Sequence, residues 1–87
     1  MYYLDESPQF RKIMKRLSKK DRAAFERVKK KVLEIVKNPT VYKELSNKMA
    51  GLRRVHIGHF VLIFYVDEPN KIVKMLDYEH HDYAYRK

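Results

Sequence analysis

The sequence predicts an α+β fold in which a helical hairpin covers one face of a small, mainly antiparallel sheet. Two observations lead to this prediction. The first half of the chain carries apolar residues at the helical spacing i, i+3, i+4 and i+7, whereas the second half is rich in β-branched and aromatic residues with strand periodicity. The expected order of elements is β-α-α-β-β-β, and we expect residues 1–87 to form a single domain.

The first strand and helix are predicted near the N-terminus. Residues 1–4 favour a short strand because two of them are tyrosines. Ser7 is a suitable N-cap and Pro8 suits the first helical position, so a helix should begin there. Its apolar stripe consists of Phe10, Ile13, Met14 and Leu17.

A second helix should follow, over about residues 19–37. Ser18 and Asp21 resemble a capping box and indicate the link between the helices. Asn38 should end this helix, because the residue before a proline disfavours the helical conformation. The apolar stripe of this helix consists of Phe25, Val28, Val32, Ile35 and Val36.

The pattern changes to strands after a less regular stretch at 40–51. Arg54 and His56 alternate with two aliphatic residues, which places both basic side chains on one face of a strand. Turn signals stand at 58–59 and 67–71, and they separate the strands expected at 60–66 and 72–78. The helices should cover one face of the sheet and leave the other available for function.

The charge of the chain narrows its possible partners. Twenty Lys and Arg stand against eleven Asp and Glu, giving a net charge of +9. A charge of this size on a short chain favours a polyanionic partner over a merely solubilising surface. The sequence has no cysteine, no signal peptide and no apolar run near the roughly 18 residues of a membrane span. We therefore expect a cytoplasmic protein that contacts no membrane.

The tail at 77–87 holds the residues best suited to acid–base chemistry. It contains His80, His81, Asp82 and Tyr85 and ends in two basic residues. Histidine serves as either acid or base near neutral pH, arginine binds phosphate in a bidentate manner, and tyrosine stacks on RNA bases. Together these groups could cleave RNA without a metal, through attack of the ribose 2′-OH on the neighbouring phosphate.

The histidines also allow two other interpretations, a metal site and ordinary surface residues. A metal site is disfavoured, because adjacent residues on an extended chain point to opposite sides. Each histidine alone could be an ordinary surface residue. No glycine-rich phosphate loop is present, and no cofactor is expected.

The order of these features resembles the RelE/ParE toxin superfamily of toxin–antitoxin systems. The resemblance covers nearly the whole chain. It rests on the opening Ser7-Pro8-Gln9-Phe10, the stop at Asn38-Pro39, the segment 52–58 and the closing segment 78–86, which is similar to the superfamily's C-terminal His-Arg-Asp-x-x-Tyr signature.

The resemblance implies a RelE-like toxin that cleaves mRNA on the ribosome, together with an acidic, RelB-like antitoxin as partner. The implied partners are thus the antitoxin, the ribosome and mRNA. By this resemblance Arg54, His56, His81 and Tyr85 match functional positions of the family, and we expect these residues and His80 to be catalytic. We expect Arg53, His59, Arg86 and Lys87 to bind RNA.

One position departs from the superfamily pattern. Many members carry an arginine where this chain has Val61, and that arginine is thought to stabilise the transition state. Two alternatives to the nuclease are therefore kept. One is a ParE-like gyrase poison, and the other is a non-catalytic relative that binds RNA, the ribosome or the antitoxin. The histidines and Arg54 favour the nuclease, and Val61 favours the non-catalytic relative.

Overall fold

The structure is a computed structural model that describes residues 1–45 and 51–84. Helices α1 (Pro8–Lys20) and α2 (Arg22–Lys37) follow the strand β1 (Tyr3–Glu6) and lead through a short 3-10 turn, η1 (Pro39–Val41), to the rest of the sheet. The remaining elements are β2 (Leu52–Ile57), β3 (Phe60–Asp67), β4 (Ile72–His80) and the short helix α3 (His81–Ala84).

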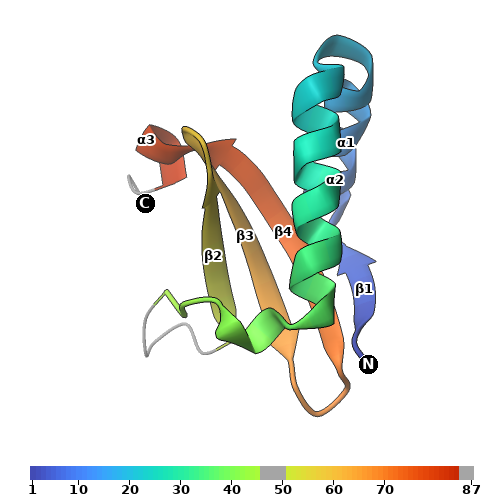
Figure 1. Ribbon diagram of the computed structural model, residues 1–87, viewed down its shortest axis with the longest axis vertical. Helices are drawn as coiled ribbons and strands as arrows, with labels where there is room; N and C mark the ends of the chain where they lie inside the picture. Colours follow the sequence, from blue (N-terminus) through green and yellow to red (C-terminus); the bar gives the residue numbers. More distant parts are fainter. Residues whose placement is uncertain (46–50, 85–87) are drawn as a thin grey trace.

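The four strands form one mixed sheet in the order β1-β4-β3-β2. β1 is parallel to β4, and the other neighbours are antiparallel. Figure 1 shows the two long helices side by side on one side of the sheet, with α3 at the end of the sheet that carries the β2–β3 turn. The predicted α+β fold is confirmed, and no helix within 1–45 and 51–84 is long and apolar enough to cross a membrane.

The core lies between the hairpin and the sheet. Phe10 and Ile35 from the helices are fully buried against Leu62, Phe64 and other strand residues. Alternation along β3 sends these two residues toward the helices. The opposite face of the sheet, turned away from α1 and α2, is called the open face below.

Ser7 begins the first helix as predicted. Its hydroxyl oxygen accepts a hydrogen bond from the Phe10 amide at 3.0 Å, and the hydroxyl donates to the Leu76 carbonyl of β4 at 2.8 Å. Pro8 occupies the first turn of α1, where its missing amide hydrogen costs nothing. The cap therefore starts the helix and also ties it to the sheet.

The predicted link between the helices was wrong in its position. Ser18 lies inside α1, where its hydroxyl donates to the Lys15 carbonyl at 2.7 Å instead of capping the next helix. Asp21 is the N-cap of α2, and its carboxylate accepts from the Ala24 amide at 3.1 Å. A single residue thus separates the two helices, and α2 ends at Lys37, before Asn38-Pro39, as predicted.

Two strands differ from their predicted bounds. β1 covers Tyr3–Glu6 instead of 1–4, and pairs with Ile72–Met75 of β4. β4 runs two residues farther than predicted, to His80, because its register with β3 continues to the Phe60–His80 pair. Because β4 is longer than predicted, His80 lies on a different face of the sheet from the one expected.

Candidate functional site

The open face carries Arg54 and His56, as the alternation in the sequence predicted. Arg54 pairs with Ile63 across the β2–β3 ladder, and His56 pairs with Val61. Directly opposed residues share a face of a sheet. Val61 is 1% exposed yet lies outside the core cluster that contains Leu62, which agrees with its place on the open face.

His81 joins His56 at the end of this face. The chain leaves β4 at His81 and turns into α3, and the His81 amide donates to the His59 carbonyl at 2.8 Å. The imidazole rings of His56 and His81 have their centroids 5.4 Å apart and are inclined by 34°. Both side chains reach solvent, so two imidazoles lie close together on the face that carries Arg54. Arg54 precedes His56 by two residues on β2.

Asp82 lies within reach of both tail histidines. Its carboxylate oxygens are 3.8 Å from His81 Nδ1 and 3.7 Å from His80 Nδ1. The Asp82 amide also donates to His80 Nδ1 at 3.3 Å. Asp82 therefore contacts His80 through its backbone amide as well as through its carboxylate.

His80 does not lie on the open face, contrary to the prediction. It is the last residue of β4 and pairs with Phe60, so it points to the same side as Tyr78, a member of the core cluster. The prediction took the tail to leave the sheet before His80. The longer β4 instead places the two adjacent histidines on opposite sides of the sheet end.

Arg53 is also on the other side from the one predicted. It pairs with Phe64 of the core, and its side chain is only 15% exposed. Its Nη1 donates to the Tyr42 carbonyl at 2.6 Å, and its Nη2 lies 3.8 Å from the Glu44 carboxylate. Arg53 thus anchors the segment after α2 instead of facing an RNA.

The remaining predicted residues fall into two groups. His59 is exposed in the β2–β3 turn, where Gly58 has a positive φ of 62°, and its predicted contact with RNA stays a prediction. Tyr85, Arg86 and Lys87 lie outside the described residues.

Val61 brings no cation to the site. It lies between His56 and Glu79 in a row across three strands, and it is almost fully buried. Of the two predicted arginines of β2, only Arg54 lies on the described open face. It is half-buried and has an interaction partner. A phosphate at this site would meet Arg54 and the two imidazoles.

Two carboxylates on the open face were not predicted from the sequence. Glu79 shares the row of His56, and Asp77 shares the row of Arg54. Two inter-strand spacings separate the backbones of His56 and Glu79, or about 10 Å. Asp77 and Glu79 are two residues apart, which would place both on one face of a strand. This could be used only if β4 was known to continue past Tyr78.

No metal site competes with this interpretation among residues 1–45 and 51–84, where no three His, Asp or Glu side chains form a group that could hold an ion. Around the His56–His81 pair, the open face therefore offers two imidazoles, the guanidinium of Arg54 and the carboxylates of Asp77 and Glu79. Such a set can move protons and bind a phosphate.

Comparison with known proteins gives the family. The family described as "ParE toxin of type II toxin-antitoxin system, parDE" matches residues 6–85. "Putative toxin RelE4" of Methanocaldococcus jannaschii is 43% identical over 88 residues, which cover 100% of this chain and 94% of that protein. An uncharacterized protein of Methanosarcina mazei is 41% identical over 98% of this chain and 100% of its own length.

Solved structures share the fold at lower identity. A chain of the intact E. coli RelBE toxin–antitoxin complex superposes with a TM-score of 0.75 at 19% identity, over 92% of this chain and 96% of that one. A chain of the YoeB–YefM complex from Staphylococcus aureus also has a TM-score of 0.75, at 17% identity, over 93% of this chain and 98% of that one. Together with the family match, these findings show that the chain belongs to the RelE/ParE superfamily of toxins of toxin–antitoxin systems.

Proposed function

We propose that this toxin is a ribosome-dependent mRNA endonuclease. The observation that supports the proposal best is the His56–His81 ring pair, 5.4 Å between centroids, on the same face as Arg54. Two imidazoles and a guanidinium are sufficient for metal-free cleavage of RNA. The net charge of +9 supports a polyanionic substrate.

The proposed reaction needs two proton transfers. One imidazole takes the proton of the ribose 2′-OH, whose oxygen attacks the adjacent phosphorus. The other imidazole gives a proton to the departing 5′-oxygen, and Arg54 stabilises the charge on the phosphoryl oxygens. The products are a 2′,3′-cyclic phosphate and a free 5′-hydroxyl, so atoms and protons balance without a cofactor.

We also propose an acidic antitoxin as partner. Similar chains come from the RelBE toxin–antitoxin complex, from toxin RelE bound to an antitoxin RelB peptide, and from the YoeB–YefM complex. The net charge of +9 would speed the association with an acidic chain. An antitoxin that covered the open face would block Arg54 and both imidazoles at once.

Cleavage on translating ribosomes tests the nuclease proposal. Purified toxin, added to a reconstituted translation reaction, is expected to cut mRNA within the ribosomal A site and to leave 2′,3′-cyclic phosphate ends. The ribosome itself needs free Mg²⁺, so metal cannot be removed from this reaction. Whether cleavage proceeds without a metal is therefore judged from the chemical form of the cut RNA ends. Intact mRNA in a reaction with active ribosomes would contradict the proposal.

A non-catalytic function is the second candidate, because Val61 is buried where the superfamily often has an arginine. In that case the toxin would bind the ribosome and leave the mRNA intact. Co-sedimentation with ribosomes in the same reaction separates this outcome from a gyrase poison, which would instead stop DNA supercoiling. The substitution Val61→Arg adds a direct check, since a gain of cleavage is expected only if the rest of the site is in place.

A further inference from the structure

Four rings form a continuous row on the helix side of the sheet end, opposite the proposed active site. The Phe60 ring stacks on Tyr78 with centroids 4.8 Å apart and planes 12° apart. His80 meets Phe60 edge-on at 5.4 Å, and His59 lies parallel to His80 at 6.4 Å. The row therefore runs from the core toward solvent, in the order Tyr78, Phe60, His80 and His59.

The row is anchored at one end and accessible at the other. Tyr78 is 7% exposed and belongs to the core cluster, whereas Phe60 is 37% exposed. The His80 side chain is 41% exposed, and His59 is exposed in the turn. A ring held on a buried base loses little freedom when a ligand stacks on it, so such a surface is prepared for binding.

The charge of the chain fits a nucleic acid on this row. Burial raises the pKa of Tyr78, and Arg27 and Asp21 act on it in opposite directions, so the positive charge that supports such a ligand is the net +9 of the whole chain. Stacked bases are followed by phosphates, and single-stranded nucleic acids are bound by aromatic rings beside positive charge.

We propose that His59, Phe60 and His80 form a stacking platform for one unpaired base of single-stranded RNA. The inference rests on the proposed function, and it adds a second contact for the same substrate. The His81 amide is bonded to the His59 carbonyl, so the platform and the His56–His81 pair are fixed to the same turn. A nucleotide beside the scissile phosphate can therefore pass over the sheet end and place its base on this side.

Fluorescence of a labelled RNA tests the platform without cleavage. The probe is a short single-stranded RNA that contains 2-aminopurine and is 2′-O-methylated throughout, so that it cannot be cut. Stacking on a protein ring quenches 2-aminopurine, and the full-length toxin is expected to quench it. Phe60→Leu keeps an apolar residue but removes the ring, and is expected to weaken binding about 5- to 150-fold, the range of one base–aromatic stack.

Tyr65→Leu is the matched control. Tyr65 lies on the same strand with a similar exposure of 39%, but its register places it on the open face, far along β3 from the turn. Its replacement should leave quenching unchanged. A second variant, His59→Ala, changes an exposed turn residue with little risk to folding, and it should weaken quenching as well.

The outcomes separate the platform from the nuclease. Equal quenching by wild type and by both platform variants, each with a native thermal transition, would overturn the platform even if mRNA is cleaved. Absence of quenching by the wild type would overturn it too. Loss of quenching in Phe60→Leu but not in Tyr65→Leu supports it, and intact mRNA on ribosomes would then refute only the nuclease.

Discussion

Arg53 and Arg54 are neighbours in the sequence with different roles in the structure. The guanidinium of Arg53 is bonded to the Tyr42 carbonyl beneath the loop after α2, and Arg54 lies on the open face. Arg53→Ala is expected to lower the free energy of unfolding by about 2 kcal/mol, because charged hydrogen bonds contribute roughly 1.5–3 kcal/mol each. Chemical denaturation measures this loss.

Arg54→Ala is the opposite case. Its midpoint of denaturation should stay close to that of the wild type, while mRNA cleavage falls by roughly 100- to 1000-fold, the usual cost of removing a group that stabilises the transition state. If Arg53→Ala lost activity at full stability and Arg54→Ala did not, the assignment of the two faces would be wrong.

The two histidines of the open face should differ in weight. We expect His81→Ala to relieve growth arrest more than His56→Ala, because His81 Nδ1 also lies 3.8 Å from the Asp82 carboxylate, which can orient its imidazole. Loss of one acid or base typically costs about 100- to 10,000-fold in rate. Colony counts after induced expression measure the effect, and full toxicity of His81→Ala would remove the tail from the mechanism.

Gly51 tests a close backbone approach. Its φ is +86°, and a Cβ atom there would lie 2.6 Å from Tyr65 Cε1. Gly58 also has a positive φ, of +62°, but a Cβ there meets nothing within 4 Å. Thermal unfolding should therefore show a larger loss for Gly51→Ala than for Gly58→Ala, which pays only the left-handed conformation, roughly 1 kcal/mol. Equal losses would show that the ring moves away freely.

At the scale of elements, the cap of α1 makes the sharpest prediction. Ser7→Ala removes the bond to the Phe10 amide and the bond to β4, so it should cost about 1–2 kcal/mol of unfolding free energy. Ser18→Ala, inside the same helix, removes only a bond to the Lys15 carbonyl and should stay within about 0.5 kcal/mol. Urea denaturation of both variants checks the difference, and equal costs would exclude a special role for the cap.

The sequence predicted the elements well where local chemistry decides them. Ser7, Pro8 and Pro39 act through the backbone of their own neighbours, so the start of α1 and the end of α2 were predicted correctly. The end of β4 depends on pairing with Phe60, which is twenty residues away, and local periodicity does not contain that information. His80 was therefore assigned to the wrong face, whereas His81, whose ring lies beside that of His56, was assigned to the correct one.

The misassignment of Arg53 has a similar cause. Alternation along β2 separates Arg53 from Arg54, but local sequence does not show that the Arg53 guanidinium donates to the Tyr42 carbonyl on the helix side of the sheet. Ser18 was misassigned because a hydroxyl can cap the next helix or bond back into its own, and only the packing of the hairpin decides between these.

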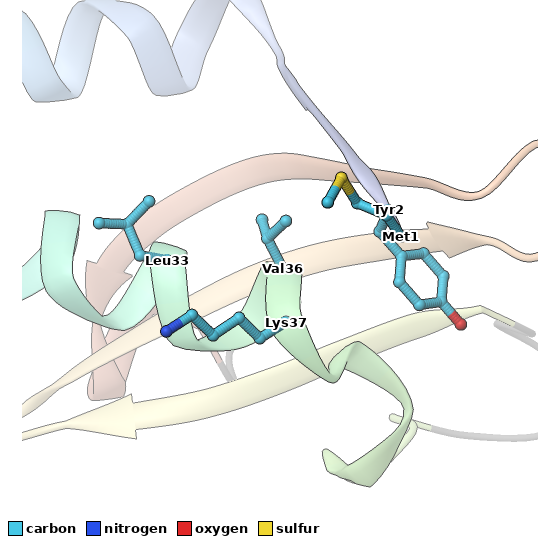
Figure 2. Close-up of a pocket in the computed structure, with 5 residues that line it drawn as sticks. All are labelled: Met1, Tyr2, Leu33, Val36 and Lys37. Atoms are coloured by element: carbon cyan, nitrogen blue, oxygen red, sulfur yellow. The ribbon is translucent and has the colours of Figure 1, made fainter.

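At the scale of the whole molecule, the N-terminus is tied to the β3–β4 turn. The Tyr2 hydroxyl donates to one Glu68 carboxylate oxygen, and Lys71 Nζ donates to the other at 2.9 Å. Figure 2 shows Tyr2 and Met1 beside Leu33, Val36 and Lys37 of α2, around a hollow of about 480 Å³. The polar cluster thus fixes the start of β1 at the β3–β4 turn.

This cluster predicts a pH dependence. The bonds from Tyr2 and then Lys71 hold the pKa of Glu68 below its ordinary value of 4.5. A lowered pKa stabilises the fold above the ordinary value, and the contribution disappears as pH falls through the lowered pKa. The difference in Tm between wild type and Glu68→Gln should therefore be largest near neutral pH and shrink below pH 4.5. A difference that grew in acid would contradict this linkage.

The parallel pairing of β1 with β4 has a consequence for synthesis of the toxin. Tyr3 is made well before its partner Ile72. The helical hairpin can form on the nascent chain from local contacts, whereas this sheet edge must wait until β4 has been made. A translation product truncated before residue 72 would therefore lack both the partner of β1 and the tail histidines, so the active site can assemble only after these residues have been added.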